Sequence, residues 1–135
     1  MAAGSIEIDL SAIEEGQQLK TKWRGKPIFV RHRTPAEIKK AIETDVSDCP
    51  DPQTDEERFV AKADGQIDQR YLVMIGVCTH FGCVPVAEAG DFDGWYCPCH
   101  GSHYDTAGRI RKGPAPTNME IPPYEYISDT VIKVG

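Results

Sequence analysis

The stretch from Cys78 to Asp105, CTHFGCVPVAEAGDFDGWYCPCHGSHYD, constrains the fold and the chemistry of this chain more than any other part of the sequence. It holds four of the five cysteines and three of the four histidines. The first group has the spacing Cys-x-His-x2-Cys, and thirteen residues later the second has the spacing Cys-x-Cys-His. Two groups of soft ligands this close together predict a loop-rich lobe that is held by a metal centre, by a disulfide or by both.

Three kinds of site use such residues. A structural zinc ion takes four Cys or His ligands, but it would leave two of the cysteines here without a role. A disulfide framework or a thiol redox centre would not explain the histidines at matching places, and the pair Cys97-x-Cys99 lacks the usual C-x-x-C form. The third possibility is an iron–sulfur site of mixed ligation, in which two cysteines hold one iron and two histidines hold the other.

Mixed ligation gives all six of these side chains a role. One cysteine and one histidine from each loop supply the ligand set: Cys78 with His80, and Cys97 with His100. Cys83 and Cys99 are then spare, one in each loop, and can bond to each other. A disulfide between them would enclose 15 residues, for which the chain-entropy estimate is about 3 kcal/mol of stabilisation.

The rest of the sequence predicts an antiparallel β fold with one helix. Thr34 can cap a helix, Pro35 suits its first position and Glu37 its third, so we expect a helix from there to about Thr44. Gly113 to Pro116 predicts a stiff loop, because proline fixes φ and glycine permits tight turns. Short strands are expected at 5–10, 18–23, 27–33, 71–77, 119–121, 124–127 and 130–134.

Composition excludes some classes of partner. The net charge is −6 and no run of lysine and arginine is present, so we expect no nucleic-acid partner. The longest apolar run, Tyr71 to Cys78, is far shorter than the roughly 18 residues of a membrane-spanning helix. Residues 47–70 are polar and predict a long excursion, with a surface insertion at 45–57. Cys49 within it is expected to be a free thiol on or under a loop.

The two Cys/His boxes, CTHFGC (78–83) and CPCHGSHYD (97–105), resemble the cluster loops of Rieske iron–sulfur proteins of the ubiquinol-oxidising cytochrome bc complex, of the bacterial or mitochondrial type. GRIRKGPAP (108–116) resembles the segment that covers the cluster, and a looser similarity runs from residue 25 to the C-terminal strands. The resemblance implies one Rieske-type 2Fe-2S cluster in a single domain, 1–135. The implied fold is an antiparallel β-sheet sandwich with one helix and a cluster-binding lobe of about 72–118.

The resemblance also implies roles for the residues of both boxes: Cys78 and Cys97 would ligate the inner iron, His80 and His100 the outer iron through Nδ1, and Cys83 and Cys99 would form the disulfide. Neutral imidazoles in place of two thiolates account for the high potentials of such centres, roughly −150 to +300 mV.

Two hydroxyl groups would raise the potential further, because donors aimed at sulfur spread the added charge. Ser102 would donate to a bridging sulfide and Tyr104 to the Cys78 sulfur. His103 points the other way by strand alternation and His32 lies far from the boxes, so both are expected to be structural.

In function, the resemblance implies a subunit of quinol–cytochrome c reductase. His100, together with His80, would meet ubiquinol in a pocket of cytochrome b, take one electron and one proton, and pass the electron to a c-type cytochrome. A membrane anchor and hinge would precede residue 5 in the full-length protein, and this chain would be a soluble fragment. The expected location is the periplasmic or intermembrane-space side of the membrane, which suits a disulfide.

The alternative is a soluble Rieske-type carrier that feeds an oxygenase. The boxes of that class lack the two extra cysteines, Cys83 and Cys99. One departure from the bc-type pattern is Phe81, which stands next to His80 where leucine is usual.

Overall fold

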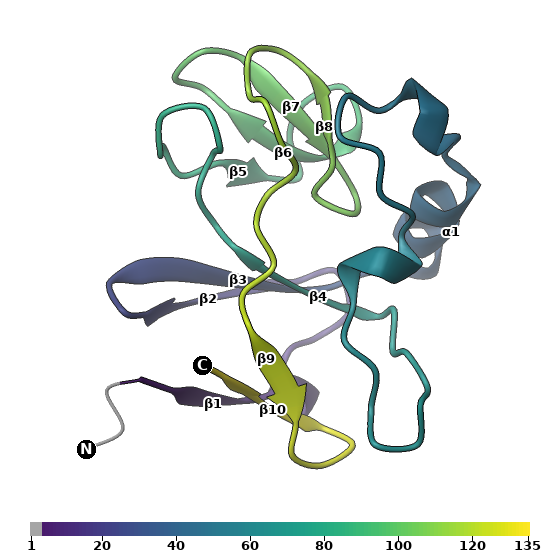
Figure 1. The fold of residues 1–135 in the computed structure, drawn as a ribbon, viewed down its shortest axis with the longest axis vertical. Helices are drawn as coiled ribbons and strands as arrows, with labels where there is room; N and C mark the ends of the chain where they lie inside the picture. The colour runs from purple at the N-terminus through teal and green to yellow at the C-terminus, as the bar shows by residue number, and fades with distance from the viewer. Residues whose placement is uncertain (1–3) are drawn as a thin grey trace.

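Three antiparallel sheets lie one above another in the computed structural model, which describes residues 4–135 (Figure 1). The lower sheet consists of β1 (Ile6–Asp9), β10 (Val131–Val134) and β9 (Tyr124–Tyr126), in that order. The middle sheet consists of β2 (Gln18–Trp23), β3 (Lys26–His32) and β4 (Tyr71–Ile75). The upper sheet consists of β5 (Val86–Ala87), β6 (Asp93–Cys97), β7 (Ser102–Asp105) and β8 (Ile110–Lys112). The mostly-β fold with one helix is therefore confirmed.

Strands β3 and β4 of the middle sheet are buried on both faces, and strand alternation decides which core each side chain enters. Ile28 and Val30 of β3 pack into the core shared with the lower sheet, whereas Phe29 between them packs into the core under the upper sheet. In β4 all five residues of the sequence YLVMI are buried. The unbroken apolar run at β4 thus reflects a strand with a hydrophobic core on each side.

The helix α1 (Pro35–Glu43) lies beside the sheets, and its local sequence explains where it begins. Thr34 accepts a hydrogen bond from the Glu37 backbone, and the Glu37 side chain bonds back to the Thr34 backbone. This capping box satisfies two amides at the helix start and confirms the predicted helix. No helix among residues 4–135 is long and apolar enough to cross a membrane.

The strand predicted at 119–121 is wrong. This segment lies on the path from β8 to β9, which descends from the upper to the lower sheet in Figure 1. Its backbone hydrogen bonds are divided between two layers: the Met119 amide donates to Gly108, and Glu120 accepts from the Ile75 amide. A segment that changes layers has no single neighbouring strand with which to form a ladder.

The polar excursion between α1 and β4 is more firmly anchored than its composition predicts. It contains the 3-10 helices η2 (Val46–Asp48) and η3 (Glu56–Arg58), and Asp55 and Arg58 are buried within it. Cys49 is a free and buried thiol, as predicted. A third 3-10 helix, η1 (Leu10–Ala12), follows β1.

Candidate metal centre

Two tight loops at one end of the upper sheet carry the Cys/His residues. In the first loop, after β4, the Cys78 amide donates to the Cys83 carbonyl at 2.7 Å and the Gly82 amide donates to the Cys78 carbonyl at 2.9 Å. The second loop joins β6 to β7, whose end residues Cys97 and Ser102 are register partners. Each loop therefore closes on its own backbone, which fixes where its side chains point.

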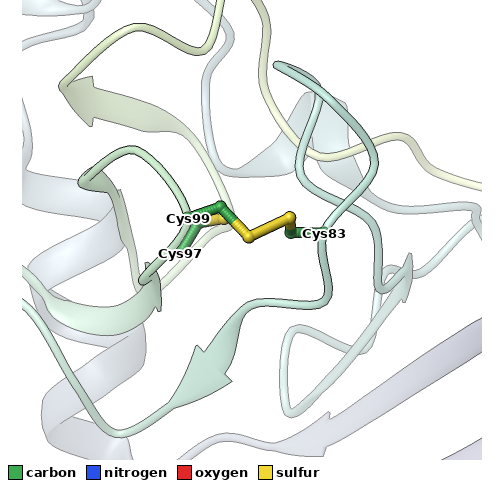
Figure 2. Close-up of side chains that lie close together, drawn as sticks. All are labelled: Cys83, Cys97 and Cys99. Carbon is green, nitrogen blue, oxygen red and sulfur yellow. A yellow bond between two sulfur atoms is a disulfide. The ribbon is translucent and has the colours of Figure 1, made fainter.

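The predicted disulfide between Cys83 and Cys99 ties the loops together, with 6.6 Å between the two Cα atoms (Figure 2). The sulfur of Cys97 lies beside it, and the three sulfur atoms are all within 4.8 Å of one another. This trio is not a three-thiolate metal site, because two of its sulfur atoms are bonded to each other. Only Cys97 keeps a thiol that can bind iron.

The second available thiol at this site is that of Cys78. Both free thiols are buried, with 3% of Cys78 and 2% of Cys97 exposed. Burial raises the pKa of the Cys78 thiol, but hydrogen bonds outweigh this effect and leave the pKa below its ordinary value; the side-chain donors are Tyr104, Cys97 and Ser102. Burial raises the pKa of Cys97. A lowered pKa favours thiolate, which is the form that binds metal.

The imidazoles of His80 and His100 lie close together and come from the same two loops as these thiols. Their ring centres are 4.8 Å apart and the rings are nearly perpendicular, at 88°. In the described part of the chain, the Nδ1 atom of His80 is buried without a hydrogen-bond partner. An unsatisfied buried polar atom costs about 1–3 kcal/mol, and a metal ion at this position would satisfy it. Two buried thiols and an orphaned imidazole nitrogen thus fit a metal centre of mixed ligation.

Two buried hydroxyl groups lie next to the thiols. The Tyr104 hydroxyl donates to the Cys78 sulfur at 3.3 Å and accepts from the Thr79 amide at 3.2 Å. Burial, together with the hydrogen bond to Cys78, raises the pKa of Tyr104 to about 12, so the hydroxyl keeps its proton at neutral pH. The Ser102 hydroxyl accepts from the Ala115 amide at 3.1 Å, which leaves its own proton free to be donated elsewhere.

Thr79 is a residue of the site to which the sequence analysis gave no role. Its hydroxyl donates to the Thr117 carbonyl at 2.6 Å, so it connects the first loop to the proline-rich segment. Its position between Cys78 and His80 was the only available indication.

Phe81 forms an exposed cap over the two imidazoles. Its ring centre lies 4.0 Å from that of His80 and 5.3 Å from that of His100, and 73% of the residue is exposed. The remaining two histidines do not join the site: His103 accepts from the Asp91 amide at 3.0 Å, and His32 Nδ1 lies 2.8 Å from the Ile13 carbonyl oxygen.

Comparison with known proteins decides between the possible centres. Residues 9–125 match the family described as Rieske [2Fe-2S] domain. The chain belongs to this family. Its cofactor is accordingly a Rieske-type 2Fe-2S cluster, and the zinc and thiol-redox alternatives are set aside.

The relatives come from both mitochondria and bacteria. The chain is 55% identical over 132 residues to "Cytochrome b-c1 complex subunit Rieske, mitochondrial" of Saccharomyces cerevisiae, covering 98% of this chain and 58% of that protein. It is 52% identical over 136 residues to "Ubiquinol-cytochrome c reductase iron-sulfur subunit" of Bradyrhizobium diazoefficiens, covering all of this chain and 74% of that protein. The chain therefore spans less than two thirds of the yeast relative.

A solved structure described as "Hyperthermophilic respiratory Complex III" contains a similar chain. The TM-score is 0.61 at 26% sequence identity, and the match covers 97% of this chain and 74% of that one. This likeness supports the fold and the family.

Proposed function

We propose that this chain is the cluster-bearing head of a ubiquinol–cytochrome c reductase. The observation that carries the proposal is that the two ligand loops hold two buried free thiols and two neighbouring imidazoles, one of which has an orphaned Nδ1. In this assignment Cys78 and Cys97 ligate one iron, and His80 and His100 ligate the other. The names of the yeast and Bradyrhizobium relatives support the same complex.

The mechanism follows from what each side chain offers. When bound, the cluster supplies a one-electron acceptor of high potential, because neutral imidazoles replace two thiolates. His100 is exposed and presents an imidazole edge with which a quinol hydroxyl can form a hydrogen bond. This imidazole receives the proton as the electron leaves ubiquinol, so the two uptakes are coupled. Tyr104 and Ser102 direct O–H groups toward the sulfur atoms and stabilise the added negative charge.

Phe81 and the disulfide border the candidate ligands. The exposed Phe81 ring packs against both imidazoles, and we infer that it borders the substrate pocket beside the exposed edge of His100. The Cys83–Cys99 bond keeps the two ligand loops together. The proposed lobe, 72–118, begins within β4 and contains the whole upper sheet.

The partners follow from the reaction. Ubiquinol would be bound by a cytochrome b subunit, and a c-type cytochrome would take the electron. We place the head on the periplasmic or intermembrane-space side of the membrane, attached there in the full-length protein by an N-terminal anchor. The disulfide supports a location outside the cytosol, because disulfides persist in oxidising compartments.

A redox titration monitored by EPR spectroscopy tests the proposal. We expect a Rieske-type EPR spectrum, a midpoint potential near the upper end of the mixed-ligand range, and a potential that falls as the pH is raised through the alkaline range. A potential well below zero would favour the alternative, a carrier for an oxygenase. Quinol-dependent reduction of cytochrome c by the full complex, lost when His100 is replaced and kept when His103 is replaced, tests the assignment of His100 rather than His103 to the site.

A further inference from the structure

The polar segment 45–60, here called the strap, reaches the base of the cluster-binding lobe through buried side chains. In Figure 1 it leaves α1, passes beside β8 and descends to η3. Asp55 within it pairs with Arg33, with nitrogen–oxygen distances of 2.8 and 3.0 Å, and both side chains are almost fully buried. The Gln53 carbonyl accepts from the buried Arg109 guanidinium at 3.1 Å. An insertion that served only as surface would not need these contacts.

Arg58 is the first of two links between the strap and the segment that covers the cluster site. It is 2% exposed, and its guanidinium donates to the carbonyls of Ala107 at 2.9 Å, Gly108 at 3.3 Å and Met119 at 2.7 Å. Burial lowers the pKa of Arg58 to about 10, yet the group still carries its charge at neutral pH. A buried charge is tolerated only where it is hydrogen-bonded. The carbonyls on both sides of residues 109–118 are thus fixed to one strap residue.

Asn118 is the second link. Its amide donates to the Asp51 carboxylate at 2.9 Å, and its side chain donates to the Asp51 carbonyl at 2.9 Å and to Gln53 at 2.8 Å. The Asn118 side-chain oxygen accepts from the Ile110 amide at 2.9 Å. Asn118 is 4% exposed. The strap therefore holds the far end of the loop that begins at Gly113.

The other side of that loop, residues 113–117, rests on the two ligand loops. A Cβ atom on Gly113 would lie only 2.5 Å from the Gly101 carbonyl oxygen and 2.7 Å from the Ser102 Cα. The Ala115 amide donates to the Ser102 hydroxyl, and the Thr117 carbonyl accepts from Thr79. The loop lies between the strap and the ligand loops, in contact with both.

The hydrogen bond from Ala115 has a consequence for Ser102. A hydroxyl that accepts from a fixed N–H keeps its own proton pointed away from that donor. In this buried site the rotation of the Ser102 hydroxyl is accordingly limited by the position of the loop.

We propose that the strap is a positioning element that raises the reduction potential of the cluster. Asp51 and Gln53 bind Asn118 and so keep residues 113–117 in contact with Ser102. This contact orients the Ser102 hydroxyl toward the cluster. Asp51, Gln53 and Arg58 are positioning residues that contact no candidate ligand. The inference has two halves: that the strap positions residues 113–117 (the mechanical half), and that this position raises the reduction potential (the redox half). The redox half rests on the proposed function, whereas the mechanical half does not.

Asp51→Ala is the informative variant because its two possible effects on the potential have opposite signs. Loss of a negative charge near a redox centre makes reduction easier and raises the potential. Loss of the loop's position weakens donation from Ser102 and lowers it. Asp51→Asn keeps an oxygen acceptor for the Asn118 amide while removing the charge. Asp48→Ala is the matched control, because Asp48 lies in the same strap and is exposed.

Hydrogen exchange measured by mass spectrometry tests the mechanical half. The amides of Ala115 and Asn118, which donate to Ser102 and Asp51, should exchange about fivefold faster in Asp51→Ala than in Asp48→Ala, which is the factor expected for losing one hydrogen bond. Asp51→Asn should restore slow exchange. Equal exchange rates in Asp51→Ala and Asp48→Ala would overturn the proposal. Gln53→Ala provides a second variant with the same expectation, since it removes one of the two acceptors of the Asn118 side chain.

Redox titration of the same proteins tests the other half. We expect the equilibrium constant for reduction to fall at least threefold in Asp51→Ala, which is about 28 mV for one electron at 59 mV per tenfold. Asp48→Ala and Asp51→Asn should show no fall. A potential that is unchanged or raised in Asp51→Ala, together with faster exchange, refutes the redox consequence. A wild-type protein without a Rieske EPR spectrum refutes the proposed function instead, and the exchange result still decides the mechanical half.

Discussion

Replacing Tyr104 with phenylalanine removes one buried hydroxyl and leaves the shape of the ring unchanged. Tyr104 is fully buried, and its hydroxyl donates to the Cys78 sulfur at 3.3 Å. A net hydrogen bond is worth about 1 kcal/mol. Since about 1.4 kcal/mol corresponds to a tenfold change and to about 59 mV for one electron, its loss should lower the midpoint potential by up to about 40 mV, the limit in which the bond acts in the reduced state alone.

The sign of this shift follows from the charge on sulfur. Reduction adds negative charge that spreads onto the ligand sulfur, so the hydrogen bond from Tyr104 is stronger in the reduced state. Its removal therefore destabilises the reduced state more than the oxidised one, and the potential falls. The Thr79 amide also loses its acceptor, which should lower the free energy of unfolding by about 1 kcal/mol.

An EPR-monitored redox titration measures the shift, and Tyr96→Phe is the matched control. Tyr96 lies one position along from Trp95, the register partner of Tyr104, and packs against His103 on the other face of the hairpin. Tyr96→Phe removes the same hydroxyl group as Tyr104→Phe, but at a position that does not contact the thiols. Equal potentials in Tyr104→Phe and Tyr96→Phe would refute the assigned role of the Tyr104 hydroxyl.

Three further outcomes are expected. Serine at both Cys83 and Cys99 should cost about 3 kcal/mol of stability and shorten the lifetime of the cluster, measured by loss of its visible absorbance on heating; an undiminished lifetime would show that the bond is not structural. Asp55→Ala leaves the Arg33 charge buried and unpaired, so denaturant unfolding should show a loss of about 3–5 kcal/mol, against at most about 0.5 kcal/mol for the exposed neighbour Glu56→Ala. His100→Ala should abolish the Rieske EPR spectrum and His103→Ala should keep it; the reverse result would contradict the ligand assignment.

The parts of the structure that sequence predicted are those encoded by neighbouring residues. The helix start at Thr34 could be predicted because its capping box lies within four residues. The metal chemistry could be predicted because the Cys and His residues of each loop lie within a few positions of one another, at a characteristic spacing. The strand β4 could be predicted because an apolar run of this length is typical of a buried strand.

The strap and its role could not be predicted, because its partners lie far along the chain. Arg58 donates to carbonyls about 50 to 60 residues away. Every residue has a backbone carbonyl, so the sequence does not reveal which of them accept. Asp51 and Gln53 have the composition of a solvated loop, and only the fold brings them to Asn118. The segment at 119–121 resembles a strand for a related reason: Met119 is buried, and Ile121 is partly buried against the cores of two layers.

The disulfide has a chemical consequence besides its mechanical one. Four sulfur atoms from the two loops are gathered in one small region, and iron binds thiolates with little regard for which cysteine supplies them. The bond between Cys83 and Cys99 removes two of the four from this competition. Only Cys78 and Cys97 keep free thiols in these loops, so four cysteines of the two loops cannot hold the cluster, and in the proposed assignment the imidazoles ligate the second iron. On the proposed ligand assignment, the oxidation of this pair of thiols would therefore favour mixed ligation, and with it a high potential.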